Sequence, residues 1–332
     1  MKQPGGLLLT YDLVEMSVIE RIKNAKGPLF TFELLPPLKG HSIDRIYAAI
    51  DRLVEFDPAY INFTSHRNEI NYLERADGLL EKKIVRIRPG TIAIAAAVKY
   101  KYNITVVPHI LCGGFTREET ENALIEMNFL GIDDVLALRG DPPKGSRRFL
   151  PEKDGHANTF ELVKQIADMN KGKYLESSLE DNTPTKFCIG VAAYPEKHFE
   201  APNMQIDIEN LKYKVDAGAG YIVTQMFFDN SKYFRFIEEC RKAGITVPII
   251  PGIKPISALN DIKLIPQAFH IDLPNDLVSA VQKCKTDQEA REVGIEWTTI
   301  QSKELIKNKV PGIHYYTLGR SDNVARIVKA SY

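Results

Sequence analysis

The stretch MQIDIENLKYKVDAGAGYIVTQMFF, residues 204–228, contains one helix followed by one strand. Its first part, 204–218, begins with acidic residues, continues as an amphipathic pattern and ends at Gly218, which is typical of a helix terminus. The apolar run at 221–228 then has the composition of a parallel strand that is buried on both faces. This order of helix, glycine and strand indicates a parallel sheet with helical crossovers.

Similar apolar runs along the whole chain predict eight strands. They lie at 29–37, 60–65, 104–111, 134–140, 187–195, 221–228, 247–253 and 313–319. Helical patterns are found between several of them, at 42–56, 116–131, 204–218 and 232–244. Eight strands that alternate with helices favour an α/β fold consisting of a single (β/α)8 barrel, the TIM barrel. The alternative is a doubly wound sheet, but the first strand is followed by ELLPPLKG rather than by a dinucleotide-binding glycine motif.

Two of these helices have readable starts. Thr116 is the predicted N-cap of 116–131, with Glu119 completing a capping box and Gly131 ending the helix. Ser42 is the predicted N-cap of 42–56. The apolar stripe of that second helix is expected to comprise Ile43, Ile46, Ile50, Leu53 and Val54.

The N-terminus is predicted to lie outside the barrel. We expect residues 1–28 to form an extension and a helix, and 29–332 to form the barrel that carries the site. Within the extension a helix is predicted from Val18 to Ala25, with Ser17 as its N-cap. Because residues 1–15 show no clear pattern, Met16 is a candidate for the natural first residue.

Composition narrows the class of protein. The 332 residues have a formal net charge of +0, which argues against a general nucleic-acid binder. No segment reaches the roughly 18 apolar residues of a membrane span. The four cysteines lie far apart, and the histidines are not spaced for metal binding, so neither a disulfide framework nor a metal site is expected. These features favour a soluble, cytoplasmic protein without a membrane or nucleic-acid partner.

Polar residues follow the apolar strands at the end where barrel enzymes hold their active sites. They are Glu33 after the first strand, Asn62, Thr64, Ser65 and His66 after the second, His109 after the third, Arg139 and Asp141 after the fourth, Tyr194, Glu196 and His198 after the fifth, Thr224 and Gln225 after the sixth, and Tyr316, Thr317 and Arg320 after the eighth. The connection at 142–157 lies at the same end and is expected to be functional. The connection at 171–186 lies at the opposite end and is expected to be a solvated loop.

Several of these residues also have a purely structural interpretation. Glu33 can be an acid that pairs with an arginine of the barrel, since buried acids are rarely unpaired. Arg139 and Asp141 can pair with each other, and His109 can be a core histidine. The function of the set therefore depends on whether the structure brings its members into one cavity.

The chain also resembles a known family. FELLPP (32–37), VPHILC (107–112), ALRGDPP (137–143), VAAYPEKH (191–198), NLKYKVDAGAGYIVTQMFFD (210–229), IIPGIKPIS (249–257) and HYYTLGR (314–320) are similar, in this order, to motifs of methylenetetrahydrofolate reductases of the short bacterial type. The resemblance covers the catalytic barrel and implies a TIM barrel that binds FAD without a dinucleotide-binding glycine motif.

The resemblance implies an activity. Hydride passes from NADH or NADPH through FAD to 5,10-methylenetetrahydrofolate, in a ping-pong mechanism that supplies methyl groups for methionine synthesis. It implies that Glu33 is the general acid that opens the methylene bridge, because apolar surroundings favour a protonated carboxyl. It also implies that Asp141 tunes the flavin and stabilises the cationic iminium form of the substrate. Self-association of the chain is a further expectation.

Binding roles follow from the same motifs. The resemblance places FAD against Thr64, His109, Arg139, Gly140, Asp141, Tyr194, His198, Asp207, Asn210 and Lys214. Gln225 fits an amide contact to the pterin, and Arg320 suits the glutamate carboxylates of folate. Two positions depart from the family pattern: Asp261 stands where a glutamine is expected, and Ile265 where an aromatic residue is expected.

Three alternatives remain open from the sequence. The first is another barrel oxidoreductase or lyase that uses a different flavin or folate derivative. The second is a member of the same family that takes electrons from a protein partner, which the departures at Asp261 and Ile265 would permit. The third is a non-catalytic barrel that serves as an interaction module.

Overall fold

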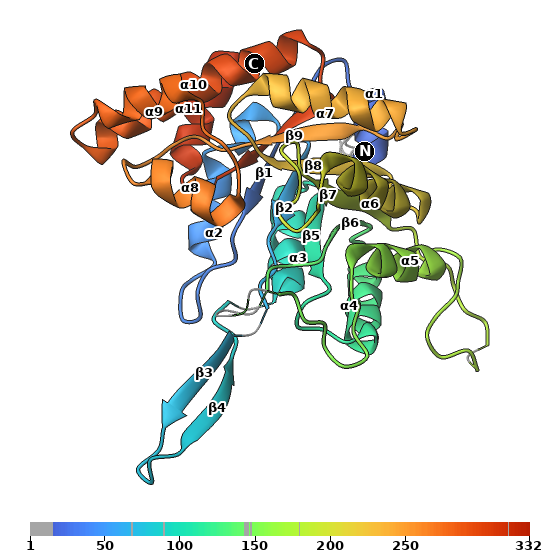
Figure 1. The fold of residues 1–332 in the computed structure, drawn as a ribbon. Coiled ribbons are helices and arrows are strands. Elements are labelled where there is room, and N and C mark those ends of the chain that lie inside the picture. The colour runs from blue at the N-terminus through green and yellow to red at the C-terminus, as the bar shows by residue number, and fades with distance from the viewer. Residues whose placement is uncertain are drawn as a thin grey trace, which may run out of the picture.

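The computed structural model describes residues 16–332, except for 68, 89, 143–145, 147, 179 and 318. Eight parallel strands close into a barrel in the order β1-β10-β9-β8-β7-β6-β5-β2 (Figure 1). The strands are β1 Leu29–Leu34, β2 Tyr60–Phe63, β5 Val106–Leu111, β6 Asp134–Leu138, β7 Cys188–Ala193, β8 Tyr221–Met226, β9 Ile249–Ile253 and β10 Gly312–Tyr316. All eight predicted strands and the barrel fold are therefore confirmed.

Helices surround the barrel (Figure 1). They are α2 Asp44–Asp51, the short 3-10 helix η1 Val54–Phe56, α3 Thr91–Tyr102, α4 Arg117–Phe129, α5 Thr159–Met169, α6 Met204–Asp216, α7 Asn230–Lys242, α8 Asp261–Phe269, α9 Asn275–Gln282, α10 Asp287–Lys307 and α11 Ser321–Ser331. Among the described residues, no helix combines the length and the apolar character that are needed to span a bilayer.

The predicted helix starts had different outcomes. The capping box of α4 is present: the Thr116 hydroxyl accepts from Glu119 N at 3.1 Å, and Thr116 N donates to the Glu119 carboxylate at 2.8 Å. The prediction for 42–56 was wrong in two respects. Its N-cap is Ile43 rather than Ser42, because the Ser42 hydroxyl accepts from Asp44 N in a tighter local turn. The segment also breaks after α2 into η1, which leaves Val54 38% exposed instead of buried.

A short helix, α1 Val18–Asn24, covers the amino ends of the strands and confirms the helix predicted there. Ser17 and Glu20 form its capping box, and Val18 N donates to the buried Asp134 carboxylate at 2.9 Å. The Ile19 side chain occupies the space where a side chain on Gly220 would stand. The predicted extension at 1–15, and with it the start at Met16, lies outside the described residues.

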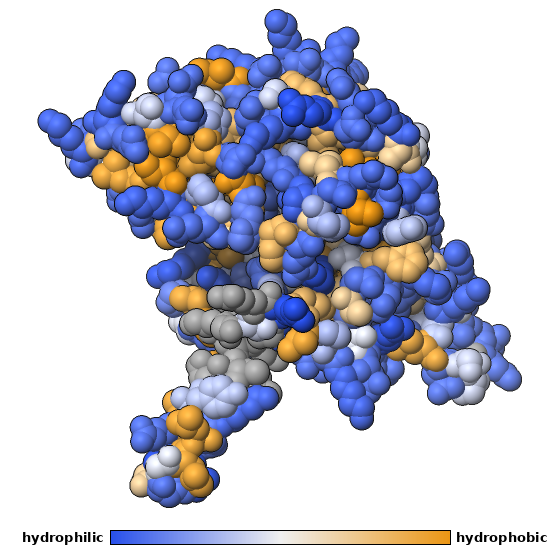
Figure 2. Space-filling view, in the orientation of Figure 1, coloured by the Kyte–Doolittle hydropathy of each residue, from blue (hydrophilic) through white to orange (hydrophobic). Residues whose placement is uncertain are grey.

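A β-hairpin extends away from the barrel after β2 (Figure 1), and it was not predicted from the sequence. Its strands are β3 Glu69–Glu74 and β4 Leu80–Val85, which pair in antiparallel register. The base is tied to the barrel loops, for example by Lys39 N donating to Ile87 O at 2.9 Å. Apolar side chains are exposed along the hairpin, including Leu73, Leu79 and Leu80 (Figure 2).

Candidate functional site at the carboxyl ends of the strands

A cavity of about 1520 Å³ opens at the carboxyl ends of the barrel strands. It exceeds the roughly 300–1,000 Å³ of most small-molecule sites, so it has room for a large cofactor together with a second ligand. Twelve of the predicted site residues line it: Glu33, Thr64, His109, Arg139, Gly140, Asp141, Tyr194, His198, Asp207, Asn210, Lys214 and Gln225. The remaining one, Arg320, lies in a smaller adjoining pocket.

Glu33 lies at the carboxyl end of β1, where its side chain is 8% exposed. Its Oε2 lies 3.6 Å from His314 Nε2 and 3.9 Å from His109 Nε2. The partner of this acid is therefore a pair of histidines, rather than the arginine considered from the sequence. A carboxyl between two imidazoles can exchange a proton with either of them when the geometry tightens around a ligand.

His109 on β5 is itself buried, and its Nε2 lies 3.3 Å from the Asn62 side-chain nitrogen on β2. Burial lowers the pKa of His109 to about 4, although the nearby Glu33 opposes this shift. His109 is therefore uncharged at neutral pH, and it brings no positive charge next to Glu33. His109 lines the cavity and has a buried polar neighbour, so it differs from the core histidine considered from the sequence.

The residues after β6 form one wall of the cavity. Gly140 has a φ of +84°, a left-handed conformation that glycine adopts without strain. Arg139 pairs with Glu200, and its guanidinium carbon lies 5.0 Å from the centre of the Phe149 ring. Arg139 thus pairs with Glu200 instead of Asp141, which was the alternative considered from the sequence. Asp141 lies exposed on the cavity wall.

The connection at 142–157 borders this wall, as predicted. Four residues at its start, 143–145 and 147, are outside the described range, but Ser146 and Leu150 line the cavity. Glu152 lies 3.6 Å from Arg67 at the base of the hairpin. The connection therefore contacts both the β6 wall and the segment that follows β2.

The loop after β7 and helix α6 form the adjacent wall, since β7 is the neighbour of β6 in the barrel. The Asp207 carboxylate accepts from His198 N at 2.8 Å, and the Lys214 ammonium donates to Ala192 O at 2.8 Å. Burial lowers the pKa of Lys214 to about 8, against the opposing charge of Asp207. Burial also raises the pKa of Tyr194 to about 12, so its hydroxyl stays protonated.

Gln225 and Thr224 at the end of β8 have different surroundings. Gln225 lines the cavity, and its amide oxygen accepts from Met226 N at 2.9 Å. Its amide nitrogen is on the same side chain and can donate to a ligand. The Thr224 hydroxyl instead accepts from Gly252 N at 2.9 Å, so it holds β8 to β9 and is not part of the site.

A smaller pocket of about 270 Å³ adjoins the cavity beside β9, β10 and α8. It contains Arg320 and also Lys254, whose side chain is almost fully buried. Asp261 and Ile265, the two departures from the family pattern, line this pocket. Tyr316, Ala268 and Phe269 border both spaces, so the pocket and the cavity are direct neighbours.

Glu196 is not in the cavity but stabilises its rim. Its side chain is 8% exposed, and its Oε2 accepts from Lys232 Nζ and from Asp272 N, each at 2.8 Å. These contacts join the β7 loop to α7 and to the segment after α8. On the cavity side, the Phe199 and His270 rings stack with a centroid distance of 4.6 Å across the same junction.

Several residues of the site were missed in the sequence. His314 begins the HYYTLGR motif but was not predicted to be a site residue. It lies on β10 directly across from Thr31 and faces Glu33. Its position in the middle of a strand rather than after it explains the omission. Lys254 was missed because a single lysine in PGIKPIS does not reveal that its side chain is buried next to a ligand space.

The fold and the cavity define a (β/α)8-barrel protein with a large cavity, lined by both polar and apolar residues, at the carboxyl ends of its strands. The profile of the family described as methylenetetrahydrofolate reductase matches residues 18–332. A 5,10-methylenetetrahydrofolate reductase from Salmonella typhimurium is 32% identical over 293 residues, which cover 88% of this chain and 86% of the relative. The chain therefore belongs to the methylenetetrahydrofolate reductase family.

Two further similarities give the limits of this comparison. Methylenetetrahydrofolate reductase (NADH) 1 from Arabidopsis thaliana is 31% identical over 316 residues, or 91% of this chain and 48% of the plant protein. The chain thus spans about half the length of such relatives. An uncharacterized protein from Clostridium thermocellum that binds two copies of 5-methyl-5,6,7,8-tetrahydrofolic acid shares the fold, with a TM-score of 0.55 at 13% identity, covering 94% of this chain and 96% of the other.

We expect the ion pair at the rim to be more important for stability than an exposed pair on the same helix. Replacing Lys232 by Met leaves the buried Glu196 carboxylate without its cation, which should cost about 1–3 kcal/mol of unfolding free energy, the usual cost when a buried polar group loses a partner. The matched variant Lys242→Met removes the exposed pair with Glu239 and should change stability little. Urea unfolding followed by circular dichroism measures both, and equal effects would contradict this assignment.

Proposed function

We propose that this protein reduces 5,10-methylenetetrahydrofolate to 5-methyltetrahydrofolate with electrons that pass from a nicotinamide dinucleotide through FAD. The family assignment supports the reaction class. The observation that carries the proposal is that one cavity contains the buried Glu33, the exposed Asp141 and the Gln225 amide, together with all the residues expected to hold FAD. Relatives named for NADH and for NADPH support a nicotinamide dinucleotide as the donor.

The residues in the cavity fit FAD. A diphosphate needs cations, and Arg139 and Lys214 both line the cavity on adjacent walls, with His198 close to each. Gly140 allows a ligand to approach the backbone closely, because no side chain stands there. The Tyr194 and His198 rings pack edge to face with centroids 4.6 Å apart, and both line the cavity, so a planar group can lie against one of them. Bound FAD supplies a group that accepts hydride from the nicotinamide and gives it to the folate.

Glu33 is the residue best placed to move a proton. Opening of the methylene bridge requires a proton on the departing nitrogen of the folate, and a protonated Glu33 can donate it. Its proton can be replaced through His314, whose Nε2 lies 3.6 Å from Glu33 Oε2, and whose Nδ1 lies 3.4 Å from the Thr31 hydroxyl. Because the carboxyl is buried, bulk water does not compete for the proton at the reacting atoms.

Asp141 and Gln225 have separate roles: Asp141 stabilises the charge of the substrate, and Gln225 orients its ring. An opened bridge carries positive charge, which the Asp141 carboxylate can stabilise across the cavity. The Gln225 amide has a donor and an acceptor, which suits the edge of a pterin ring. We therefore assign stabilisation of the cationic substrate to Asp141 and orientation of the ring to Gln225.

The assignment of Glu33 predicts a selective loss of activity. Glu33→Gln should lower the rate of folate reduction by about 10²- to 10⁴-fold, the usual contribution of a general acid. Oxidation of NADH with an artificial electron acceptor should continue, because that half-reaction does not need the proton. Steady-state assays of both reactions test this, with the surface variant Glu118→Gln as the control. Equal loss of both activities would sink the assigned role.

The assignment of Lys214 predicts that FAD affinity depends on pH. In the free protein, the pKa of Lys214 is lowered to about 8, so the ammonium is charged below that pH and loses its proton above it. Binding of the diphosphate to the neutral amine must take up a proton, so affinity should fall by up to about tenfold per pH unit above 8.

Fluorescence titration of the apoprotein with FAD between pH 7 and 9 measures this dependence. Lys214→Met should bind FAD more weakly and with little change across this range. Lys212→Met is the matched control, because Lys212 is on the same helix and pairs with Asp216 outside the cavity. A wild-type affinity that stays constant up to pH 9 would contradict the role of Lys214.

A further inference from the structure

The β3–β4 hairpin stands clear of the barrel as an arm (Figure 1). Within the described part of the chain it forms a sheet of two strands, so each strand has one edge without a neighbouring strand. Figure 2 shows apolar surface along the arm, and its large apolar side chains are 48–67% exposed: Tyr72, Leu73, Leu79 and Leu80. A two-stranded hairpin is at best marginally stable in water, whereas three or more strands can be stable. The arm is therefore expected to gain a further strand.

The register of the hairpin determines which side chains share a face of the arm. Tyr72 is paired with Lys82, and Leu73 is paired with Glu81. Side chains alternate between the two faces along a strand, so Lys82 lies on the same face as Tyr72. Glu81 and Lys83 lie on the other face, together with Leu73. All three charged residues of β4 are exposed.

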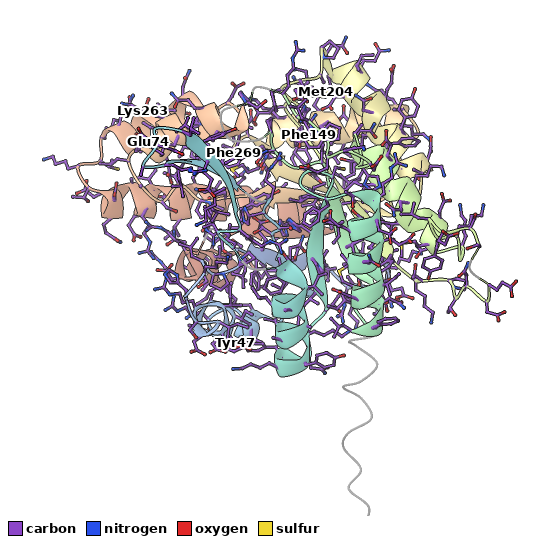
Figure 3. All side chains as sticks on the ribbon, turned by 90° about the horizontal axis from the view of Figure 1, so that it is seen from below. Tyr47, Glu74, Phe149, Met204, Lys263 and Phe269 are labelled. Atoms are coloured by element: carbon purple, nitrogen blue, oxygen red, sulfur yellow. The ribbon has the colours of Figure 1, made fainter. Side chains whose placement is uncertain are left out.

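The arm stands beside the mouth of the main cavity. Tyr72 lines the cavity, and Arg67 at the base of the arm lies 3.6 Å from Glu152. Seen from below, Glu74 at the end of β3 lies on the same side of the molecule as the cavity residue Phe269 (Figure 3). The Tyr72 face is therefore turned toward the cavity, and the opposite face is turned away from it.

The charges of β4 are complementary to those of a second copy of the same strand. When two copies run antiparallel with Lys82 at the centre, Glu81 of each lies directly across from Lys83 of the other. Opposite charges at such positions stabilise the pairing of two strands. Leu79, one residue before β4, then lies across from Val85. A shift by two residues in either direction would place Glu81 or Lys83 across from its own copy, so the charges favour a single register.

We propose that the arm joins two copies of this chain, with β4 pairing antiparallel to β4 about a two-fold axis at Lys82. The two hairpins then form one four-stranded sheet, in which main-chain hydrogen bonds along the paired edges provide affinity. The two-fold axis repeats the Glu81–Lys83 contact, so the interface contains it twice. A strand of six residues is only about 20 Å long. The dimer is therefore expected to dissociate on dilution, as complexes with small interfaces do.

Lys82 limits the strength of this contact. Its side chain lies across from Lys82 of the second copy, and like charges directly opposite each other destabilise a strand pair. A lysine on an exposed edge strand is also a common protection against unwanted pairing. The sequence of β4 thus favours one register and holds it weakly, which suits a reversible dimer.

Sedimentation velocity of the full chain over a series of concentrations measures the dissociation constant of the dimer. Glu81→Lys and Lys83→Glu should each raise it by about tenfold or more, because two opposite-charge pairs become two like-charge pairs. An equal mixture of the two variants should dimerise again, because each lysine of one variant then faces a glutamate of the other. Glu238→Lys is the control, since Glu238 is exposed on α7, away from the arm.

Lys82→Gln provides a test in the opposite direction. This change removes the central repulsion, so it should lower the dissociation constant. A loss of structure cannot imitate stronger association, and an unfolded variant cannot recover on mixing. Both of these results therefore report on the interface itself.

Weaker dimers for each single charge reversal, recovery in the mixture and a stronger dimer for Lys82→Gln support the proposal. Wild-type protein that stays monomeric at every concentration overturns it. A dimer that the changes at Glu81, Lys82 and Lys83 leave unaltered also overturns it, because another surface then holds the two copies. Single variants that are folded but do not associate on mixing contradict the proposed register.

Discussion

The pairing of β1 with β10 closes the barrel, and the arrangement of the site depends on it. The register places Thr31 across from His314 and Glu33 across from Tyr316. The Thr317 hydroxyl donates to Glu33 O at 2.7 Å, which fixes the backbone of the acid against the last strand. Because the two strands come from opposite ends of the sequence, Glu33 and its neighbour His314 exist as a pair only in the closed barrel.

Two buried lysines at the cavity and the smaller pocket have similar surroundings. Lys214 and Lys254 both have a pKa that burial lowers, and each has an acid nearby that partly compensates for this. Such cations are poorly satisfied by the protein alone, so binding of an anion can stabilise them more than it stabilises an exposed lysine.

Much of the fold could be predicted because buried parallel strands produce long apolar runs, and all eight were visible. The β3–β4 hairpin was not predicted, since its strands are exposed and carry many charges in place of an apolar run. The sequence placed Arg139 correctly at the end of its strand, but it did not predict that Glu200 is its ion-pair partner. Glu200 lies in the loop after β7, which comes close to Arg139 only when the barrel is closed. Lys254 was missed for a similar reason: whether a single lysine is buried depends on how the elements pack around it, which the local sequence does not reveal.

The central claim is that one cavity passes electrons from a nicotinamide to a methylene-bearing folate. The most direct measurement is the anaerobic absorbance of the FAD-loaded protein, first with NADH and then with 5,10-methylenetetrahydrofolate. We expect the flavin bands to bleach with NADH and to recover with the folate, with stoichiometric formation of 5-methyltetrahydrofolate. Flavin that bleaches but stays reduced when the folate is added, or protein that cannot be loaded with FAD, would contradict the claim.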